Sequence, residues 1–288
     1  MKKKWLYRLA LSLCAAVFLF SAYRVGSYYF SARQEADLYD DLLQQVQDAE
    51  KEGQQNAGQQ PDSDPDSDVP GNDEPDKDEL PADPPPLYAE SGKLYRYDAL
   101  YNQNPDLVGW IYIPGTDRSY PVMQTPKDEE YYLRRNFYKK KSNAGTPFLD
   151  KDSDLEDPNS RIMVYGHNLK SGGMFYPLTK YTKQSYWKKH PTFTFDTLYE
   201  SRTYRIVAVV QLDLAEIGHF GYYAYDHFSS AASYNGFIQQ AKEVALYDTG
   251  VTPTYGQQMM ILSTCSYHVS GDGGRLVIIA VQESADKA

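Results

Sequence analysis

Residues 257–282 read QQMMILSTCSYHVSGDGGRLVIIAVQ and contain two apolar stretches separated by a polar, glycine-rich segment. Each stretch is short and rich in aliphatic side chains, which is typical of a buried strand. We therefore expect one strand that ends at Cys265, a loop, and a second strand that begins at Arg275. If the two strands are neighbours, the loop brings the thiol and the guanidinium to the same end of the pair.

Six further segments of the same character lie between residues 108 and 213. They read VGWIYI, SYPVMQ, TPFLD, RIMVYGH, PTFTFDTL and RTYRIVAVVQLD. All are rich in β-branched and aromatic residues and are bounded by turn residues. Eight strands in roughly 200 residues predict a mostly β fold, and closure into a barrel leaves no sheet edge exposed.

Two helices complete the predicted domain. A helical pattern precedes the first strand and breaks at Asn104 and Pro105. A stronger pattern covers residues 229–250, SSAASYNGFIQQAKEVALYDTG, directly before the strand that bears Cys265. Its apolar stripe is expected at Phe237, Ala241, Val244 and Ala245.

Residues 1–30 have the pattern of a membrane anchor. Four basic residues precede an uncharged, largely apolar stretch over residues 9–23. We interpret the segment as an uncleaved single span in the cell membrane, and a cleaved signal peptide is the alternative. Basic residues before the span place the N-terminus in the cytoplasm and the rest of the chain outside the cell.

Two segments separate this anchor from the globular domain, which we place at residues 87–288. In residues 31–50, Leu38, Leu42 and Val46 recur every four positions and predict an amphipathic helix that either packs on the domain or forms a stalk. Residues 51–86 form a linker that is acidic and Pro-rich from residue 61 onward. That acidic part carries a net charge of −9 of the chain's −10, and its low hydrophobicity is incompatible with a packed core.

The charge and cysteine content narrow the function classes. No basic stripe is present, so a nucleic-acid partner is not expected. The sequence contains two Cys, and Cys14 lies in the predicted span, which leaves Cys265 as an unpaired thiol outside the membrane. Such a thiol is either a buried, inert side chain or a reactive group. No second ligand pair lies at zinc spacing, so neither a metal nor another cofactor is predicted.

A catalytic Cys needs a base nearby. His268 is three residues beyond Cys265, but it falls in the predicted loop, and odd spacing along a strand would place the two side chains on opposite faces. His167 follows a Gly at the end of the apolar strand RIMVYGH, which is a rim position of the predicted barrel. We therefore favour His167. His190 reads as a surface residue, and His219 and His227 flank a Tyr-rich loop.

The motif ILSTC at residues 261–265, the strand GRLVIIA that follows it, and YGHN about a hundred residues earlier together resemble the sortases. These are membrane-anchored cysteine transpeptidases of Gram-positive bacteria. The resemblance implies a closed eight-stranded barrel with catalytic residues Cys265, His167 and Arg275.

The class B sortases are the most similar branch. NPDLVGWIYIPGT, SYPVMQ, YYLRRNFY and YGHNLKSGGMF all look like class B patterns, as does the helix inserted before the Cys-bearing strand. The resemblance covers residues 88–283. One departure is Ser266, since relatives often have an acidic residue directly after the Cys.

The resemblance implies a transpeptidase with two kinds of partner. The first is a secreted protein with a C-terminal sorting motif, NPxTx or LPxTG-like, cleaved after its Thr through a thioacyl intermediate. The second is an amine on a peptidoglycan precursor or a pilin. His167 would exchange protons with the leaving and incoming amines, and Arg275 would hold the substrate and stabilise the oxyanion.

Three further residues are predicted to contact the substrate. Ser263 shares a strand face with Cys265, although a packed small residue is an equal interpretation. Thr264 lies between them. Tyr223 belongs to the run HFGYYAYDHF, which could form one wall of a peptide groove.

Two other function classes remain open from the sequence. The chain could be an envelope-tethered peptide-binding module in which Cys265 is inert. It could also be a papain-like cysteine peptidase, although in that fold the Cys usually precedes the His.

Overall fold

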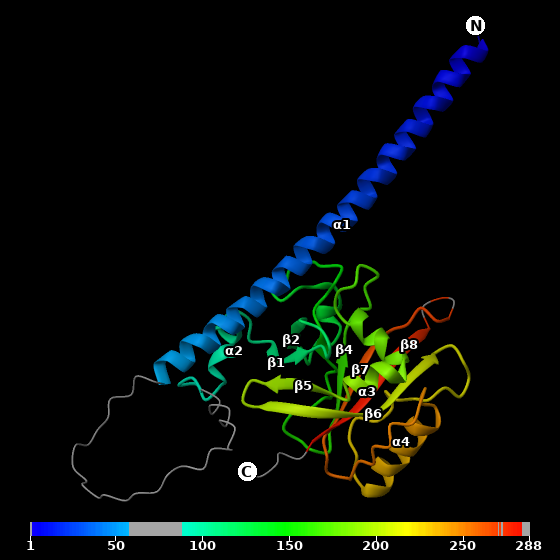
Figure 1. Ribbon diagram of the computed structural model, residues 1–288. Helices are drawn as coiled ribbons and strands as arrows, with labels where there is room; N and C mark the ends of the chain where they lie inside the picture. The colour runs from blue at the N-terminus through cyan, green and yellow to red at the C-terminus, as the bar shows by residue number, and fades with distance from the viewer. Residues whose placement is uncertain (1, 58–87, 270, 272, 284–288) are drawn as a thin grey trace, which may run out of the picture.

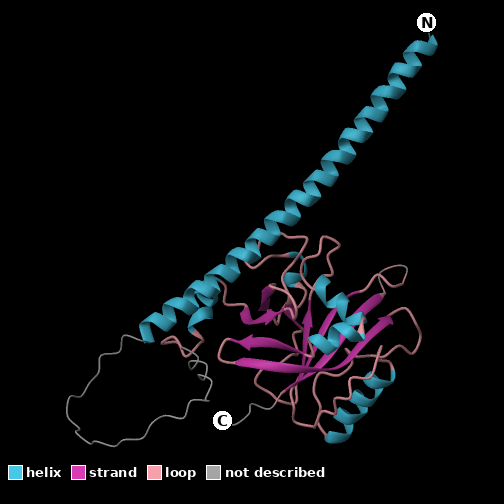
Figure 2. Ribbon diagram, in the orientation of Figure 1, coloured by secondary structure: helices cyan, strands magenta, loops and turns pink. Residues whose placement is uncertain are grey.

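The computed structural model describes residues 2–57, 88–269, 271 and 273–283. Its centre is a closed barrel (Figures 1 and 2) in which the strand order is β1-β2-β3-β4-β7-β8-β6-β5. The strands are β1 (Leu107–Tyr112), β2 (Ser119–Met123), β3 (Phe148–Leu149), β4 (Arg161–Tyr165), β5 (Thr192–Thr197), β6 (Ser201–Asp213), β7 (Met259–Cys265) and β8 (Gly274–Gln282). The predicted eight-stranded, mostly β fold is confirmed.

The strands around β7 are buried on both faces. Even-numbered residues of β7 and β8, such as Leu262 and Ile278, point into the barrel, whereas Ile261 and Ile279 belong to a second apolar cluster outside it. Side chains in strands covered on both sides are apolar at consecutive positions rather than at alternate ones. This two-sided burial explains why the sequence of these strands reads as uninterrupted apolar runs.

The second cluster is covered by α4 (Ala231–Glu243), which lies on the outside of the barrel (Figure 1). The helix begins after Ser230, whose hydroxyl accepts a hydrogen bond from Ser233 N. The helix was predicted correctly, but part of its apolar stripe was wrong. Val244 follows the last helical residue and is 45% exposed. The buried face is instead Tyr234, Phe237, Ile238 and Ala241.

Shorter helical segments connect the strands. They are α2 (Tyr95–Gln103), η1 (Tyr131–Arg134), η2 (Tyr176–Thr182) and α3 (Gln184–Lys189). The α2 helix is the one expected before the first strand, and it ends at the predicted break, with Asn104 as its C-cap.

One helix, α1 (Lys2–Ala57), runs without a break through both the predicted anchor and the predicted amphipathic segment. Its N-terminal half extends away from the barrel and its C-terminal half lies along it (Figure 1). The N-terminal half contains the one helix segment, among the residues described, that is long and apolar enough to cross a membrane. Its large apolar side chains, such as Phe18, are exposed.

The C-terminal half of α1 packs on the domain. Tyr39, Leu42 and Val46 are buried in the main core, and Leu38 packs against its edge. Of the two alternatives for this segment, the structure therefore shows packing. Because this contact precedes the acidic linker in the chain, the linker does not set the distance between α1 and the barrel. Residues 58–87, which hold most of the linker, lie outside the described part.

We expect the α1 contact to contribute measurably to stability. In a fragment of residues 31–288, Leu42→Ala should lower the free energy of unfolding by about 2–5 kcal/mol, because it removes a fully buried side chain. Urea denaturation measures this change. Gln47→Ala, on the exposed face of the same helix, should change it by less than about 0.5 kcal/mol. Equal effects of the two substitutions would mean that α1 does not pack on the barrel in solution.

Candidate active site

The strand pairing brings Cys265 and Arg275 together. Strands β7 and β8 are antiparallel neighbours, and these two residues stand directly opposite each other at the end of the ladder. Directly opposed residues project to the same face of a sheet, with Cβ atoms about 4.5–5.5 Å apart. That face is the outer one, since Cys265 continues the series of Met259 and Ile261. The thiol and the guanidinium therefore share one end of one face.

A parallel pairing brings His167 to the same place. Strand β4 pairs with β7 with Tyr165 beside Ser263, so His167 follows β4 where Cys265 ends β7. Gly166 N donates to Ser263 O at 3.2 Å, and Thr264 Oγ1 donates to Gly166 O at 2.6 Å. These bonds continue the strand contact for one residue beyond β4 and hold the backbone from which His167 projects.

Gly166 is required by close packing at this turn. A Cβ atom at position 166 would lie 2.6 Å from the ring of Phe175. Asn168, two residues after Gly166, is buried, and its Nδ2 donates a hydrogen bond of 2.8 Å to Cys265 O. The segment YGHN thus ties the loop after β4 to the end of β7 on both sides of His167.

All six residues predicted from the sequence line one cavity of about 410 Å³. They are Cys265, His167, Arg275, Ser263, Thr264 and Tyr223. Among the other lining residues, Tyr165 and Gly166 belong to the YGHN motif and Tyr222 belongs to the run HFGYYAYDHF. The rest were not singled out from the sequence, and they are Glu129, Glu130, Leu133, Phe148, Asp150 and Leu214. These residues come from η1 and the segment before it, from β3 and the residue after it, and from the start of the loop after β6. No local pattern marks them, because their place depends on how distant segments pack.

The environment of His167 defines its protonation. Its Nε2 lies 2.9 Å from Leu133 O, and because a carbonyl only accepts, Nε2 carries the proton. Burial lowers the pKa of His167, and nearby Arg134 acts in the same direction, whereas the bond to Leu133 opposes them. The imidazole is therefore mostly neutral at neutral pH, and Nδ1 is the nitrogen that can take up a proton.

The other lining residues differ in how their polar atoms are used. The Ser263 hydroxyl is buried and shares a hydrogen bond of 2.9 Å with Tyr222 OH. The Thr264 hydroxyl is committed to Gly166 O. Tyr223 is 45% exposed, and its hydroxyl lies 2.7 Å from His219 Nε2. The phenol rings of Tyr222 and Tyr223 thus stand side by side in one wall of the cavity.

His268 lies apart from this site. It is exposed, it does not line the cavity, and its Nδ1 lies 2.8 Å from Ser266 Oγ. The same hydroxyl accepts from Gln211 Nε2 at 3.0 Å. Ser266, at the position where relatives often have an acid, is thus buried between a strand side chain and a loop His.

A metal site finds no support in the described ranges. Within residues 2–57 and 88–283, apart from the few positions left out, no group of three or more His, Cys, Asp or Glu side chains is arranged to hold an ion.

Comparisons with known proteins agree with this geometry. The sortase domain family model matches residues 111–283. The chain is 31% identical to sortase B of Listeria monocytogenes over 179 residues, which are 62% of this chain and 70% of that protein. It is 28% identical to sortase B of Staphylococcus aureus over 185 residues, 64% and 73% of the two chains.

Solved structures show the same fold. A Staphylococcus aureus sortase B–substrate complex superposes with a TM-score of 0.67 at 23% identity, covering 89% of this chain and 99% of that one. Sortase B from Bacillus anthracis, in complex with the compound AAEK1, superposes with a TM-score of 0.59 at 32% identity, covering 69% and 88%. The chain therefore belongs to the sortase family of transpeptidases and is most similar to its class B members.

Proposed function

We propose that the chain is a membrane-anchored cysteine transpeptidase that joins secreted proteins to an amine of the cell wall or of a pilin. The observation that carries this proposal is the meeting of a thiol, an imidazole and a guanidinium, from the ends of three neighbouring strands, in one cavity. Cys265 is the proposed nucleophile, His167 the proton carrier and Arg275 the electrostatic stabiliser.

The reaction has two acyl-transfer steps. Cys265 Sγ attacks the carbonyl carbon of the Thr in a sorting motif, the S–C bond forms, and the C–N bond to the next residue breaks as His167 gives a proton to the leaving amine. A second amine then attacks the thioester, loses a proton to His167, and releases the thiolate. Because Nε2 of His167 is held by Leu133 O, Nδ1 makes both transfers.

Arg275 acts on the negative charge that develops on the carbonyl oxygen. Its guanidinium projects from the strand position opposite Cys265. A planar, permanently charged fork offers two parallel donors, which the point charge of a Lys does not reproduce. Its NH1 also donates to Gly274 O at 3.0 Å, which fixes the side chain at the start of β8.

The pKa of His167 sets how often the site is ready to react. Leaving-group departure needs the imidazolium, and attack needs the thiolate. Since burial lowers the pKa of His167, the imidazolium is scarce at neutral pH. We infer that catalysis proceeds from a minor population that holds both ions at once.

The proposed substrates are secreted proteins with a C-terminal NPxTx or LPxTG-like motif. The solved structure of a sortase B–substrate complex from Staphylococcus aureus supports a substrate site on this fold. Leu133, Leu214 and the two tyrosines of the wall give the cavity an apolar side for such a peptide.

The proposed location is the outer face of the cell membrane. The exposed apolar half of α1 supports a single span, and the basic residues before it support a cytoplasmic N-terminus. We propose residues 1–30 as the anchor and basic tip, 31–50 as the helix that docks on the barrel, 51–86 as the linker and 87–288 as the catalytic domain.

A peptide assay tests the proposed chemistry. A fragment of residues 31–288, which keeps the docking helix, should form a thioacyl adduct on Cys265 with an NPxTx or LPxTG peptide, and should yield an amine-exchanged product, both detected by mass spectrometry. Cys265→Ala and His167→Ala should abolish exchange, whereas His268→Ala should be near neutral. No adduct with any peptide would indicate a binding module, and hydrolysis alone in the presence of amine would indicate a peptidase.

Arg275→Lys tests the need for a planar fork. We expect kcat/KM to fall by about 10²-fold, because the Lys keeps the charge but loses the paired donors. Arg205→Lys is the matched control: Arg205 pairs with Glu283 on the exposed side of β6, away from the cavity, and should retain full activity. Equal activity of Arg275→Lys and the wild type would rule out the assigned role.

A titration tests the state of His167. In ¹⁵N-histidine NMR spectra, with His167→Ala for assignment, the imidazole should be the Nε2–H tautomer at pH 7.5 and titrate below the ordinary value of about 6.5. Because the folded pKa lies below the unfolded one, His167 costs stability as the pH falls below about 6.5. A measured pKa at or above that value would contradict the assignment of a pKa lowered by burial.

A further inference from the structure

The acceptor that orients His167 belongs to η1, a short 3-10 turn. The imidazole Nε2 bonds to Leu133 O, so the direction of the ring depends on where this turn holds its carbonyl. A four-residue turn is not rigid alone, because few of its backbone bonds are internal. Its position must come from the segments packed against it.

Residues 142–146 pack directly against this turn. Ser142 N donates to Arg134 O and Thr146 N donates to Tyr132 O, both at 3.0 Å, on either side of Leu133. Gly145 has a φ of +63°, and a Cβ atom there would lie 2.6 Å from Leu133 O. The backbone of residue 145 thus rests against the same carbonyl that holds His167.

Tyr39 of α1 fixes this segment from the other side. Its hydroxyl donates to Gly145 O at 2.5 Å and lies 2.9 Å from Thr146 Oγ1. Tyr39 is 3% exposed, and burial raises its pKa, so the hydroxyl stays protonated and remains a donor. One turn earlier, Glu35 accepts from Ser142 Oγ at 2.7 Å and from Asn143 N at 3.0 Å.

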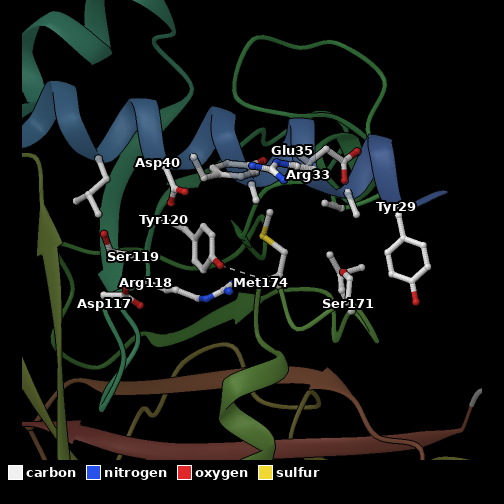
Figure 3. Close-up of a pocket in the computed structure, with 17 residues that line it drawn as sticks. Tyr29, Arg33, Glu35, Asp40, Asp117, Arg118, Ser119, Tyr120, Ser171 and Met174 are labelled. Carbon is white, nitrogen blue, oxygen red and sulfur yellow. Dashed lines mark hydrogen bonds between the residues drawn. The ribbon is translucent and has the colours of Figure 1, made fainter. Parts of the chain in front are cut away.

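The ring of Tyr39 also reaches the loop that carries His167. It packs edge-on against Tyr120, with centroids 5.4 Å apart. Tyr120 OH accepts from Met174 N at 3.1 Å (Figure 3). Met174 has a φ of +53°, a backbone state that a non-Gly residue keeps only when neighbours hold it. The next residue, Phe175, donates from its backbone N to His167 O at 2.9 Å.

These contacts lie beside a cavity in the interface, and Leu42, Val46 and Glu50 hold α1 on the domain further along the helix. A cavity of about 520 Å³ lies between α1 and the barrel. It is lined by Tyr39, Tyr120 and Met174, of which Figure 3 labels Tyr120 and Met174. Beside this cavity, α1 contacts the barrel through only a few side chains. The position of the helix therefore affects the barrel through those side chains. Tyr39 touches both segments that lead to His167.

We propose that Tyr39 is a positioning residue for His167. One route runs through Gly145 and Leu133 to the imidazole. The other runs through Tyr120 and Met174 to the backbone of His167. The docking half of the anchor helix is then part of the support of the active site and not only a stalk. This inference rests on the proposed function, in which His167 carries the proton.

Other charged or titratable groups surround the imidazole and stay in place when Tyr39 is changed. From η1 and α1 these are Arg134 and Glu35, and from the cavity walls they are Glu129, Glu130, Asp150, Cys265 and Arg275. A change in His167 on replacing Tyr39 would therefore report position and not a lost charge, because Phe and protonated Tyr are both neutral.

Tyr39→Phe is the direct test, in the full-length chain reconstituted in lipid nanodiscs. The ring and its contact with Tyr120 are kept, and the two hydroxyl bonds are lost. We expect kcat to fall about tenfold with KM within twofold, since misplacing a catalytic group affects the chemical step. In ¹⁵N-histidine spectra, the Nε2–H signal of His167 should shift and exchange faster with water.

Two further variants separate positioning from stability. Val46→Ala weakens the packing of the same helix seven residues further along. In this variant kcat should stay within twofold of the wild-type value, and the Nε2–H signal of His167 should not move. Tyr120→Phe removes the acceptor for Met174 N and should act like Tyr39→Phe. Wild-type kcat and an unmoved signal in Tyr39→Phe, or an equal loss in Val46→Ala, would overturn the inference. Full activity of His167→Ala would instead overturn the proposed function.

Discussion

Everything at the proposed active site depends on the register of β7. Its parallel pairing with β4 sets where His167 lies, and its antiparallel pairing with β8 sets where Arg275 lies. Because side chains alternate between faces, a slip of one residue would turn Cys265 into the barrel and bring a core residue out. Hydrogen bonds oppose such a slip, because it would break the bond of Ser263 to Tyr222 and the bond of Thr264 to Gly166.

The polar groups next to the proposed nucleophile, Cys265, mostly hold backbone in place. Thr264 and Asn168 bond across the gap between the end of β7 and the loop after β4. Each satisfies a carbonyl that the strand ladder leaves without a partner. The proposed catalytic side chains can then stand at a rim of the barrel, on backbone that these hydrogen bonds hold in place.

Much of this could be predicted from the sequence, and the remainder could not for physical reasons. Apolar runs located all eight strands, and the loop between Cys265 and Arg275 is short enough to imply a paired ladder. The face of α4 was partly misjudged at Val244, because periodicity alone does not show where a helix ends. Leu133 could not be found, since it lies far in sequence from the proposed catalytic residues. Tyr222 was reached only as a member of the run HFGYYAYDHF. The docking of α1 was left open because the same amphipathic pattern fits a stalk.

The unbroken course of α1 has a geometric consequence for the barrel at the membrane. A continuous helix advances about 1.5 Å and turns about 100° with each residue. If the apolar half spans the membrane as proposed, the number of residues between the lipid surface and Tyr39 sets two quantities. They are the distance of the cavity from the membrane and its rotation about the helix axis. A single residue inserted there would leave every contact within the barrel intact. It would nevertheless rotate the opening of the cavity by about 100° about the helix axis. In the proposed arrangement, the length of this helix therefore sets the orientation of the cavity relative to the membrane.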